Sequence, residues 1–268
     1  MTDGPVILTE PSALFRFRDI APGREVGEFV PLRKLSIPHG VTTRSYGEFP
    51  VAISDPQSAV MYDEFARLLG CERAAWVKQV HGGEILTVRD AGCVGEADGM
   101  VTDERGLVLL CRSADCPLIL VAGDGGRVVG VAHASWRSTA AGIAGSMIER
   151  MIGEFGCDPA GIVACISPSA GPELYEVGQD VYDAMCKTQG PDAKFFFEPI
   201  SPSATATDPK WLLDLWAANI SQLQRAGVTF MNGYTARMCT IHRADLFPSY
   251  RRDGQSAGRF VAGIAAIL

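Results

Sequence analysis

The sequence lacks an excess of positive charge, a long apolar run and any paired-cysteine motif, and each absence excludes a class of protein. Its 24 lysines and arginines against 31 acidic residues give a net charge of −7. Nucleic acid is therefore not expected as a partner, because phosphate backbones bind basic surfaces. No stretch reaches the roughly 18 consecutive apolar residues of a membrane span, so no membrane insertion is expected.

The eight cysteines stand singly, without a C-x-x-C pair. The first residues, Met1 to Asp19, have no basic segment followed by an apolar run, so no signal peptide is expected. The cysteines are then predicted to be reduced thiols in a cytoplasmic protein. A chain of 268 residues, 47% of them hydrophobic, can bury a core that is stable without disulfides.

Hydrophobic periodicity predicts strands and helices in alternating groups. Strands are expected within 1–35 and over 75–80, 84–88, 106–111, 118–122, 128–133, 162–166 and 258–268. Helices are expected over 57–69, 138–155, 178–187 and 210–226, the second one capped by Ser138 or Thr139 and ended by Gly156. Asp124-Gly125-Gly126 should close a hairpin. Grouped strands with inserted helices predict the α+β class: one domain, 1–268, of layered mixed β-sheets flanked by helices.

The chain has only four histidines, and two of them follow apolar strands. Gly82-Gly83 follows His81, and two alanines flank His133, so a ligand can approach either imidazole closely. Cys116 and His133 lie at similar distances from the predicted hairpin turn, which would bring them together. His39 and His242 are expected to be surface or loop residues.

Two imidazoles and one thiolate form a ligand set that suits zinc. Three protein ligands leave the fourth tetrahedral position open, as in catalytic zinc sites. The alternative interpretation is structural, because a cysteine between strands is commonly a small core residue. The wide spacing of His81, Cys116 and His133 does not by itself decide between the two.

Several ordered motifs resemble those of one known family. Lys78-Gln79-Val80-His81-Gly82, Ala114-Asp115-Cys116 and His133-Ala134-Ser135-Trp136-Arg137 resemble the three signatures of the laccase-domain family, also called polyphenol oxidase-like or YfiH-like, which includes purine nucleoside phosphorylases. Further segments that resemble this family begin at Gly40, Tyr175, Asp214, Cys239 and Ser249. The resemblance thus runs from residue 40 to residue 254.

The resemblance implies a zinc ion bound by His81, Cys116 and His133, which would also be catalytic. It implies purine nucleosides and phosphate as substrates, with phosphorolysis of adenosine, inosine and methylthioadenosine and deamination of adenosine. Ser135 and Ser138 stand where the family usually has glycine, which bears on substrate identity rather than on the metal. The older family name implies oxidation of polyphenols by copper.

Five further residues in these motifs are candidates for substrate binding. Arg44, Arg137 and Arg252 could each hold a phosphate by two parallel hydrogen bonds, or form structural ion pairs. Lys78 and Gln79 could orient the substrate or support the metal site, or belong to a solvated strand end.

Asp115 is a candidate catalytic proton carrier or hydrogen-bond partner of a ligand histidine, although it could instead cap a turn. Cys116 with His133 could alternatively be a nucleophile–base pair. The resemblance also implies a link of some family members to cell-wall precursor editing, so that pair, or the zinc, could serve an amidohydrolase that edits peptidoglycan precursors. A protein that only binds metal or nucleoside is a third alternative.

Copper is disfavoured as the cofactor, although it binds N/S sites more tightly than zinc. A multicopper oxidase needs many imidazoles, commonly as His-x-His pairs, whereas this chain has four histidines and no such pair. The chain is expected to be a monomer or a small homo-oligomer.

Overall fold

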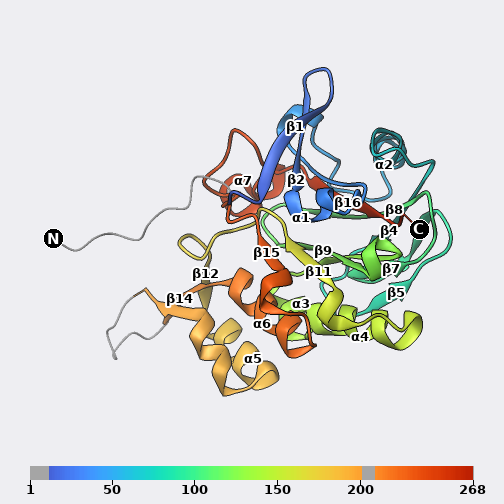
Figure 1. The fold of residues 1–268 in the computed structure, drawn as a ribbon. Helices are drawn as coiled ribbons and strands as arrows, with labels where there is room; N and C mark the ends of the chain where they lie inside the picture. Colours follow the sequence, from blue (N-terminus) through green and yellow to red (C-terminus); the bar gives the residue numbers. More distant parts are fainter. Residues whose placement is uncertain (1–11, 201–208, 268) are drawn as a thin grey trace.

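The computed structural model describes residues 12–200 and 209–267, in which two large β-sheets stack face to face between helices (Figure 1). In sheet order, the seven-stranded sheet contains β1 (Phe15–Ala21), β2 (Arg24–Phe29), β3 (His39–Thr42), β16 (Phe260–Ala265), β8 (Leu107–Ser113), β4 (Arg73–Lys78) and β6 (Gly92–Glu96). The six-stranded sheet contains β15 (Gly233–Thr235), β11 (Val163–Ile166), β9 (Leu118–Gly123), β10 (Val128–His133), β7 (Gly99–Thr102) and β5 (Ile85–Thr87).

A small third sheet, seven α-helices and several short 3-10 helices make up the rest of the regular structure in the described residues. The third sheet contains β12 (Glu176–Gly178), β14 (Lys210–Leu213) and β13 (Phe197–Pro199). The helices are α1 (Val30–Lys34), α2 (Pro56–Leu68), α3 (Trp136–Ala140), α4 (Ile143–Phe155), α5 (Gln179–Gln189), α6 (Leu215–Arg225) and α7 (Tyr250–Asp253).

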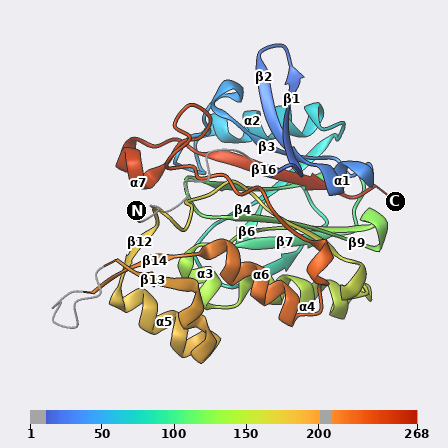
Figure 2. The same ribbon diagram turned by 60° about the vertical axis from the view of Figure 1, so that its left-hand side comes forward.

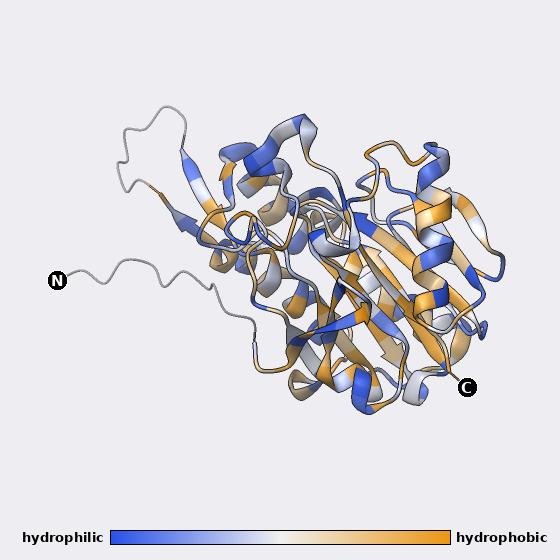
Figure 3. Ribbon diagram, turned by 90° about the horizontal axis from the view of Figure 1, so that it is seen from above, coloured by the Kyte–Doolittle hydropathy of each residue, from blue (hydrophilic) through white to orange (hydrophobic). Residues whose placement is uncertain are grey.

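Three apolar layers hold this arrangement together. Leu107 and Leu109 of β8 face the space between the two large sheets, whereas Val108 and Leu110 face α2. Successive side chains of a strand point to opposite faces, so a strand covered on both sides is apolar throughout. Helices α4 and α6 cover the outer face of the six-stranded sheet (Figures 1 and 2). Figure 3 shows the resulting apolar colouring of the central strands.

The predicted α+β class, with layered mixed sheets and flanking helices, is confirmed. The hairpin is also confirmed: β9 and β10 pair in a register that places His133 opposite Leu118. Helix α2 lies where it was predicted, with the Asp55 side chain capping its first turn. That one domain spans residues 1–268 stays a prediction, since residues 1–11, 201–208 and 268 lie outside the described ranges.

Two predicted helices were wrong in their extent. The helix expected over 138–155 is two helices, because Gly142 adopts a left-handed backbone with φ of 84° between them. Ser135, rather than Ser138 or Thr139, caps the first one by accepting a hydrogen bond from the backbone N–H of Ser138. The helix expected over 210–226 begins only at Leu215, since the preceding residues form β14 and pair with β12 and β13.

All eight cysteines lie in the described ranges and are free thiols. In those same ranges, every helix is too short or too polar to serve as a membrane span.

Candidate active site

Three connections between the two large sheets meet at one end of the sandwich. Strands β4, β6 and β8 are parallel neighbours, so their carboxyl ends lie at the same edge. Each leads into a strand of the other sheet, and the three connections carry His81, Asp98 and Cys116. His133 ends β10 next to the start of β9. This topology brings together side chains that are far apart in the sequence.

The three predicted metal ligands line one cavity of about 330 Å³. The ring centroids of His81 and His133 are 5.0 Å apart, and the rings are nearly perpendicular. The lining residues are Val51, Gln79, His81, Arg112, Ser113, Ala114, Cys116, His133, Tyr250 and Arg259.

Asp98 holds both histidines in place. Its carboxylate is fully buried and accepts a hydrogen bond from Nδ1 of His133 at 3.0 Å. It also accepts the backbone N–H groups of Val80 at 3.1 Å and Gly82 at 2.6 Å, which flank His81. A carboxylate on one ring nitrogen fixes the tautomer and leaves the other nitrogen for the cavity side. Asp98 was not predicted, because Asp98-Gly99 resembles an ordinary turn at the start of a strand.

The charges in this cluster shift the pKa values of both imidazoles. Burial lowers the pKa of His133, but the charge of Cys116 and the hydrogen bonds to Asp98 and Cys116 outweigh it and raise the pKa to about 9. Burial, followed by the charge of His133, lowers the pKa of His81. Burial raises the pKa of Asp98, yet the hydrogen bonds from His133 and Gly82 outweigh it and lower the pKa. His133 is therefore the more basic of the two imidazoles.

The side chains of His81, Cys116 and His133 are suitable zinc ligands in their chemistry, and they share one cavity. Two imidazoles and a thiol line one cavity, and a buried carboxylate supports one imidazole as in many metal sites. Among the described residues, however, no three His, Cys, Asp or Glu side chains are arranged as a metal-binding group. His133 and Cys116 instead interact with each other. A metal that bound both side chains would take the place of this interaction and would require a deprotonated thiolate and a neutral imidazole.

The other two histidines lie away from this cavity. His39 was expected at the surface but is buried in β3, where one ring nitrogen accepts the backbone N–H of Phe29 and the other contacts the carbonyl of Ile37. His242 is exposed, as expected. The described residues therefore bring two of the four imidazoles to the cavity, too few for the trinuclear and blue-copper centres of a multicopper oxidase.

Asp115 bonds to the C-terminal part of the chain rather than to an imidazole. Its carboxylate accepts hydrogen bonds from the Thr240 hydroxyl at 2.7 Å, the Ser249 hydroxyl at 3.0 Å and the backbone N–H of Arg251 at 2.7 Å. The role of histidine partner, predicted for Asp115, belongs to Asp98. A catalytic role for Asp115 stays a prediction.

The backbone is strained at two residues of the site. His81 and Asp115 have φ values of 61° and 100°, in a region that non-glycine residues rarely adopt. Such strain persists only where surrounding bonds hold it, and it is concentrated at functional sites. Here, the Asp98 carboxylate bonds the residues around His81, and three hydrogen bonds hold the Asp115 side chain.

Of the five residues predicted to bind substrate, Gln79 lines the cavity. Its side-chain amide bonds to Arg112, donating to the carbonyl at 2.9 Å and accepting the backbone N–H at 3.0 Å. Lys78 instead pairs with Glu96 at 2.7 Å, and both side chains are exposed.

The three predicted arginines lie outside the described cavity lining. Arg44 pairs with Glu48 and Asp253. Arg137 is exposed, with its guanidinium 4.3 Å from the centre of the Trp136 ring.

Arg252 uses all five of its side-chain donors within the fold. It forms two hydrogen bonds with Asp253 and one each with the carbonyls of Thr240, Ile241 and Phe247. In this conformation it has no donor left for a phosphate. The arginines that do line the cavity are Arg112 and Arg259, which the sequence motifs did not single out.

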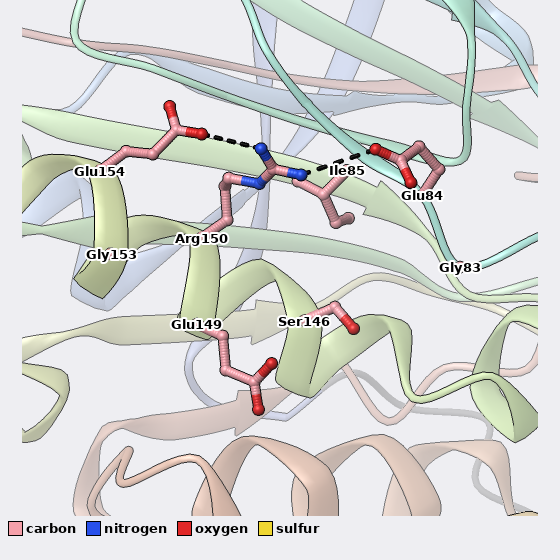
Figure 4. Close-up of a pocket in the computed structure, with 8 residues that line it drawn as sticks. All are labelled: Gly83, Glu84, Ile85, Ser146, Glu149, Arg150, Gly153 and Glu154. Carbon is pink, nitrogen blue, oxygen red and sulfur yellow. Dashed lines mark hydrogen bonds and ion pairs between the residues drawn. The ribbon is translucent and has the colours of Figure 1, made fainter.

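A second groove, of about 380 Å³, lies between the β5 region and α4 (Figure 4). Arg150 lies in it between Glu154, at 2.7 Å, and Glu84, at 3.5 Å. The lining contains no histidine or cysteine and its one arginine is already paired, so the chemistry points to the first cavity instead.

Solved structures share this sandwich. The chain resembles the crystal structure of a YfiH protein from Bacillus licheniformis with a TM-score of 0.82 and 25% identity, covering 94% of this chain and 99% of that one. It resembles YlmD from Geobacillus stearothermophilus with a TM-score of 0.78 and 29% identity, covering the same shares of the two chains.

The sequence comparisons define the family. Residues 38–267 match the family described as multi-copper polyphenol oxidoreductase laccase. A relative named purine nucleoside phosphorylase from Xylella fastidiosa is 36% identical, over 92% of this chain and 89% of its own length. The chain belongs to this laccase-domain family, as its motifs had indicated.

Proposed function

We propose that this protein is a purine nucleoside phosphorylase with a zinc centre formed by His81, Cys116 and His133. The observation that carries the proposal is the meeting of these three side chains in one cavity, with Asp98 bonded to one of them and to the backbone around another. The names of the relatives support the activity. Adenosine, inosine and methylthioadenosine are the proposed substrates, and deamination of adenosine is proposed as a second reaction.

Zinc held by these residues would act as a Lewis acid on the bound substrate. Around it, Asp98 orients His133 and fixes the loop that carries His81. Phosphorolysis forms a bond from a phosphate oxygen to the sugar carbon and breaks the bond from that carbon to the purine nitrogen. The cavity must therefore hold an anion beside a flat ring, and the half-exposed ring of Tyr250 in its wall suits stacking against a purine.

One observation favours a second candidate function. His133 interacts with both Cys116 and Asp98, the order of contacts found in nucleophile–base–carboxylate triads. Such an arrangement would suit a cysteine-type amidohydrolase acting on a cell-wall precursor. Metal content separates the two, because a thiolate that binds zinc is not free to attack an amide.

The test is metal analysis followed by product identification. The purified protein is expected to carry about one zinc per chain, and Cys116→Ser to lose most of it. Inosine should yield hypoxanthine and a ribose phosphate only when inorganic phosphate is present. Metal-free protein that hydrolyses an amide through Cys116 would establish the second candidate, and base release without phosphate would show nucleoside hydrolysis.

We also propose that the protein acts in the cytoplasm, as a monomer or a small homo-oligomer. The free state of all eight cysteines in the described ranges supports a reducing compartment.

A further inference from the structure

Two arginines in the wall of the cavity have no ion-pair partner among the described residues. Arg112 donates to the carbonyl of Pro50 at 3.1 Å and lies beside the Tyr62 hydroxyl. Arg259 donates to the carbonyls of Ala257 at 2.7 Å and Gly258 at 2.9 Å. All of these acceptors are neutral, so neither guanidinium charge is matched by a bonded carboxylate.

The strand register places these two charges side by side. In the pairing of β8 with β16, Arg112 lies opposite Val261, two residues after Arg259. Side chains alternate along a strand, so Arg112 and Arg259 point to the same face as diagonal neighbours. Like charges so placed repel each other, and the charge of Arg112 adds to burial in lowering the pKa of Arg259.

The surroundings offset this repulsion only in part, because Asp115 and Cys116 favour the charged form of Arg259 but its pKa is still lowered overall. Of the described residues that line the cavity, none is acidic. The carboxylates of Asp115 and Asp98 bond to other groups, Asp115 to the C-terminal segment and Asp98 to His133 and the backbone around His81, and no ion pair joins either to Arg112 or Arg259 among the described residues. The cavity wall is therefore locally positive although the whole chain has a net charge of −7, which favours binding of an anion there.

We propose that Arg112 and Arg259 form the subsite for a tetrahedral oxyanion, inorganic phosphate, beside the cysteine and histidines of the cavity. This inference rests on the proposed function. It assigns the binding of phosphate to two arginines other than the motif residues Arg44, Arg137 and Arg252. Guanidinium groups bind phosphate oxygens through parallel, charge-assisted hydrogen bonds. A bound phosphate would neutralise both charges.

Gln79 is a positioning residue for this subsite. Its amide holds both backbone polar groups of Arg112, where the ladder between β4 and β8 has ended at Trp76 and Leu110. The contact fixes the direction in which Arg112 leaves the strand. Gln79 thereby supports the anion subsite through the backbone of Arg112.

Calorimetric titration of the purified, metal-loaded protein with inorganic phosphate tests the inference without reference to turnover. Arg259→Gln and Arg112→Gln should each weaken phosphate binding about ten- to a hundredfold, the loss expected for charged hydrogen bonds. Arg259→Lys, which keeps the charge but loses the fork, should weaken it less. Arg16→Gln, a change at an exposed arginine of β1, should leave binding unchanged.

Phosphate binding that survives both glutamine substitutions, or that is lost in Arg44→Gln but not in Arg259→Gln, would overturn the inference. No phosphate binding to the unsubstituted protein, with or without nucleoside, would also overturn it. Steady-state assays separate this inference from the proposed function. Phosphate-dependent inosine cleavage with an unaltered KM for phosphate in both glutamine variants would support the proposed function and refute the subsite. Phosphate binding that depends on the two arginines, without any nucleoside cleavage, would support the subsite and refute the proposed function.

Discussion

Replacing Asp98 with asparagine tests how the site is held together. One carboxylate oxygen of Asp98 accepts from His133 and the other from the backbone N–H groups of Val80 and Gly82. Asparagine has the same shape but only one acceptor oxygen, so its amide N–H₂ must face a donor on one side. The substitution therefore loses either the contact to His133 or both contacts around His81.

The magnitude follows from burial and charge. Because the Asp98 side chain is fully buried, the unmatched donor has no water to bond, and loss of a buried, charged partner typically costs about 3 kcal/mol of unfolding free energy. Loss of a carboxylate behind a metal-binding histidine typically weakens metal binding by about 10- to 100-fold. We expect both effects in Asp98→Asn.

Urea unfolding and zinc competition with a chelator measure the two effects separately. Glu96→Gln is the matched control, since Glu96 is exposed, precedes Asp98 by two residues and, within the described ranges, pairs with exposed Lys78 alone. It should cost less than about 1 kcal/mol. If Asp98→Asn has the unfolding free energy and zinc affinity of the unsubstituted protein, the role given to Asp98 is wrong.

Two further predictions concern the C-terminal segment and pH. Asp115→Asn should loosen the segment from Thr240 to Arg251, seen as faster amide hydrogen exchange there, and lower the unfolding free energy by about 1–3 kcal/mol; unchanged exchange would show that these bonds do not hold it. In chelator-treated protein, protonated His133 should stabilise the fold fully below a pH of about 6.5, the pKa of histidine in the unfolded chain. This stabilisation should be lost as the pH rises through about 9, the raised pKa of His133 in the folded protein. Zinc affinity should rise over the same range, because a proton on His133 competes with the metal. Metal affinity that is flat between these pH values would contradict the assignment.

The sequence predicted those parts of the fold that local patterns control. Asp124-Gly125-Gly126 identified the β9–β10 hairpin, and the apolar runs located most of the strands around it. The helix over 138–155 was predicted as one piece because a single glycine is compatible with a helix, whereas its left-handed backbone at Gly142 depends on tertiary packing. Residues 210–213 have a helical pattern of apolar side chains, but pairing with two neighbouring strands overrides it.

Candidate site residues could be predicted where the residue type itself indicates a chemical role. Only four histidines are present, and His81, Cys116 and His133 stand in motifs that resemble the family signatures, so they could be named as candidates before the fold was known. Asp98, Arg112 and Arg259 could not, because their roles depend on which partners the fold supplies. The motif arginines Arg44 and Arg252 illustrate the converse, since the fold pairs them with Asp253.

X-ray absorption at the zinc edge on the purified protein tests the central assignment most directly. We expect one sulfur at about 2.3 Å and two imidazole nitrogens at about 2.0–2.1 Å around the zinc, with the sulfur lost in Cys116→Ser. Zinc without a sulfur neighbour, or a sulfur signal that persists in Cys116→Ser, would contradict it.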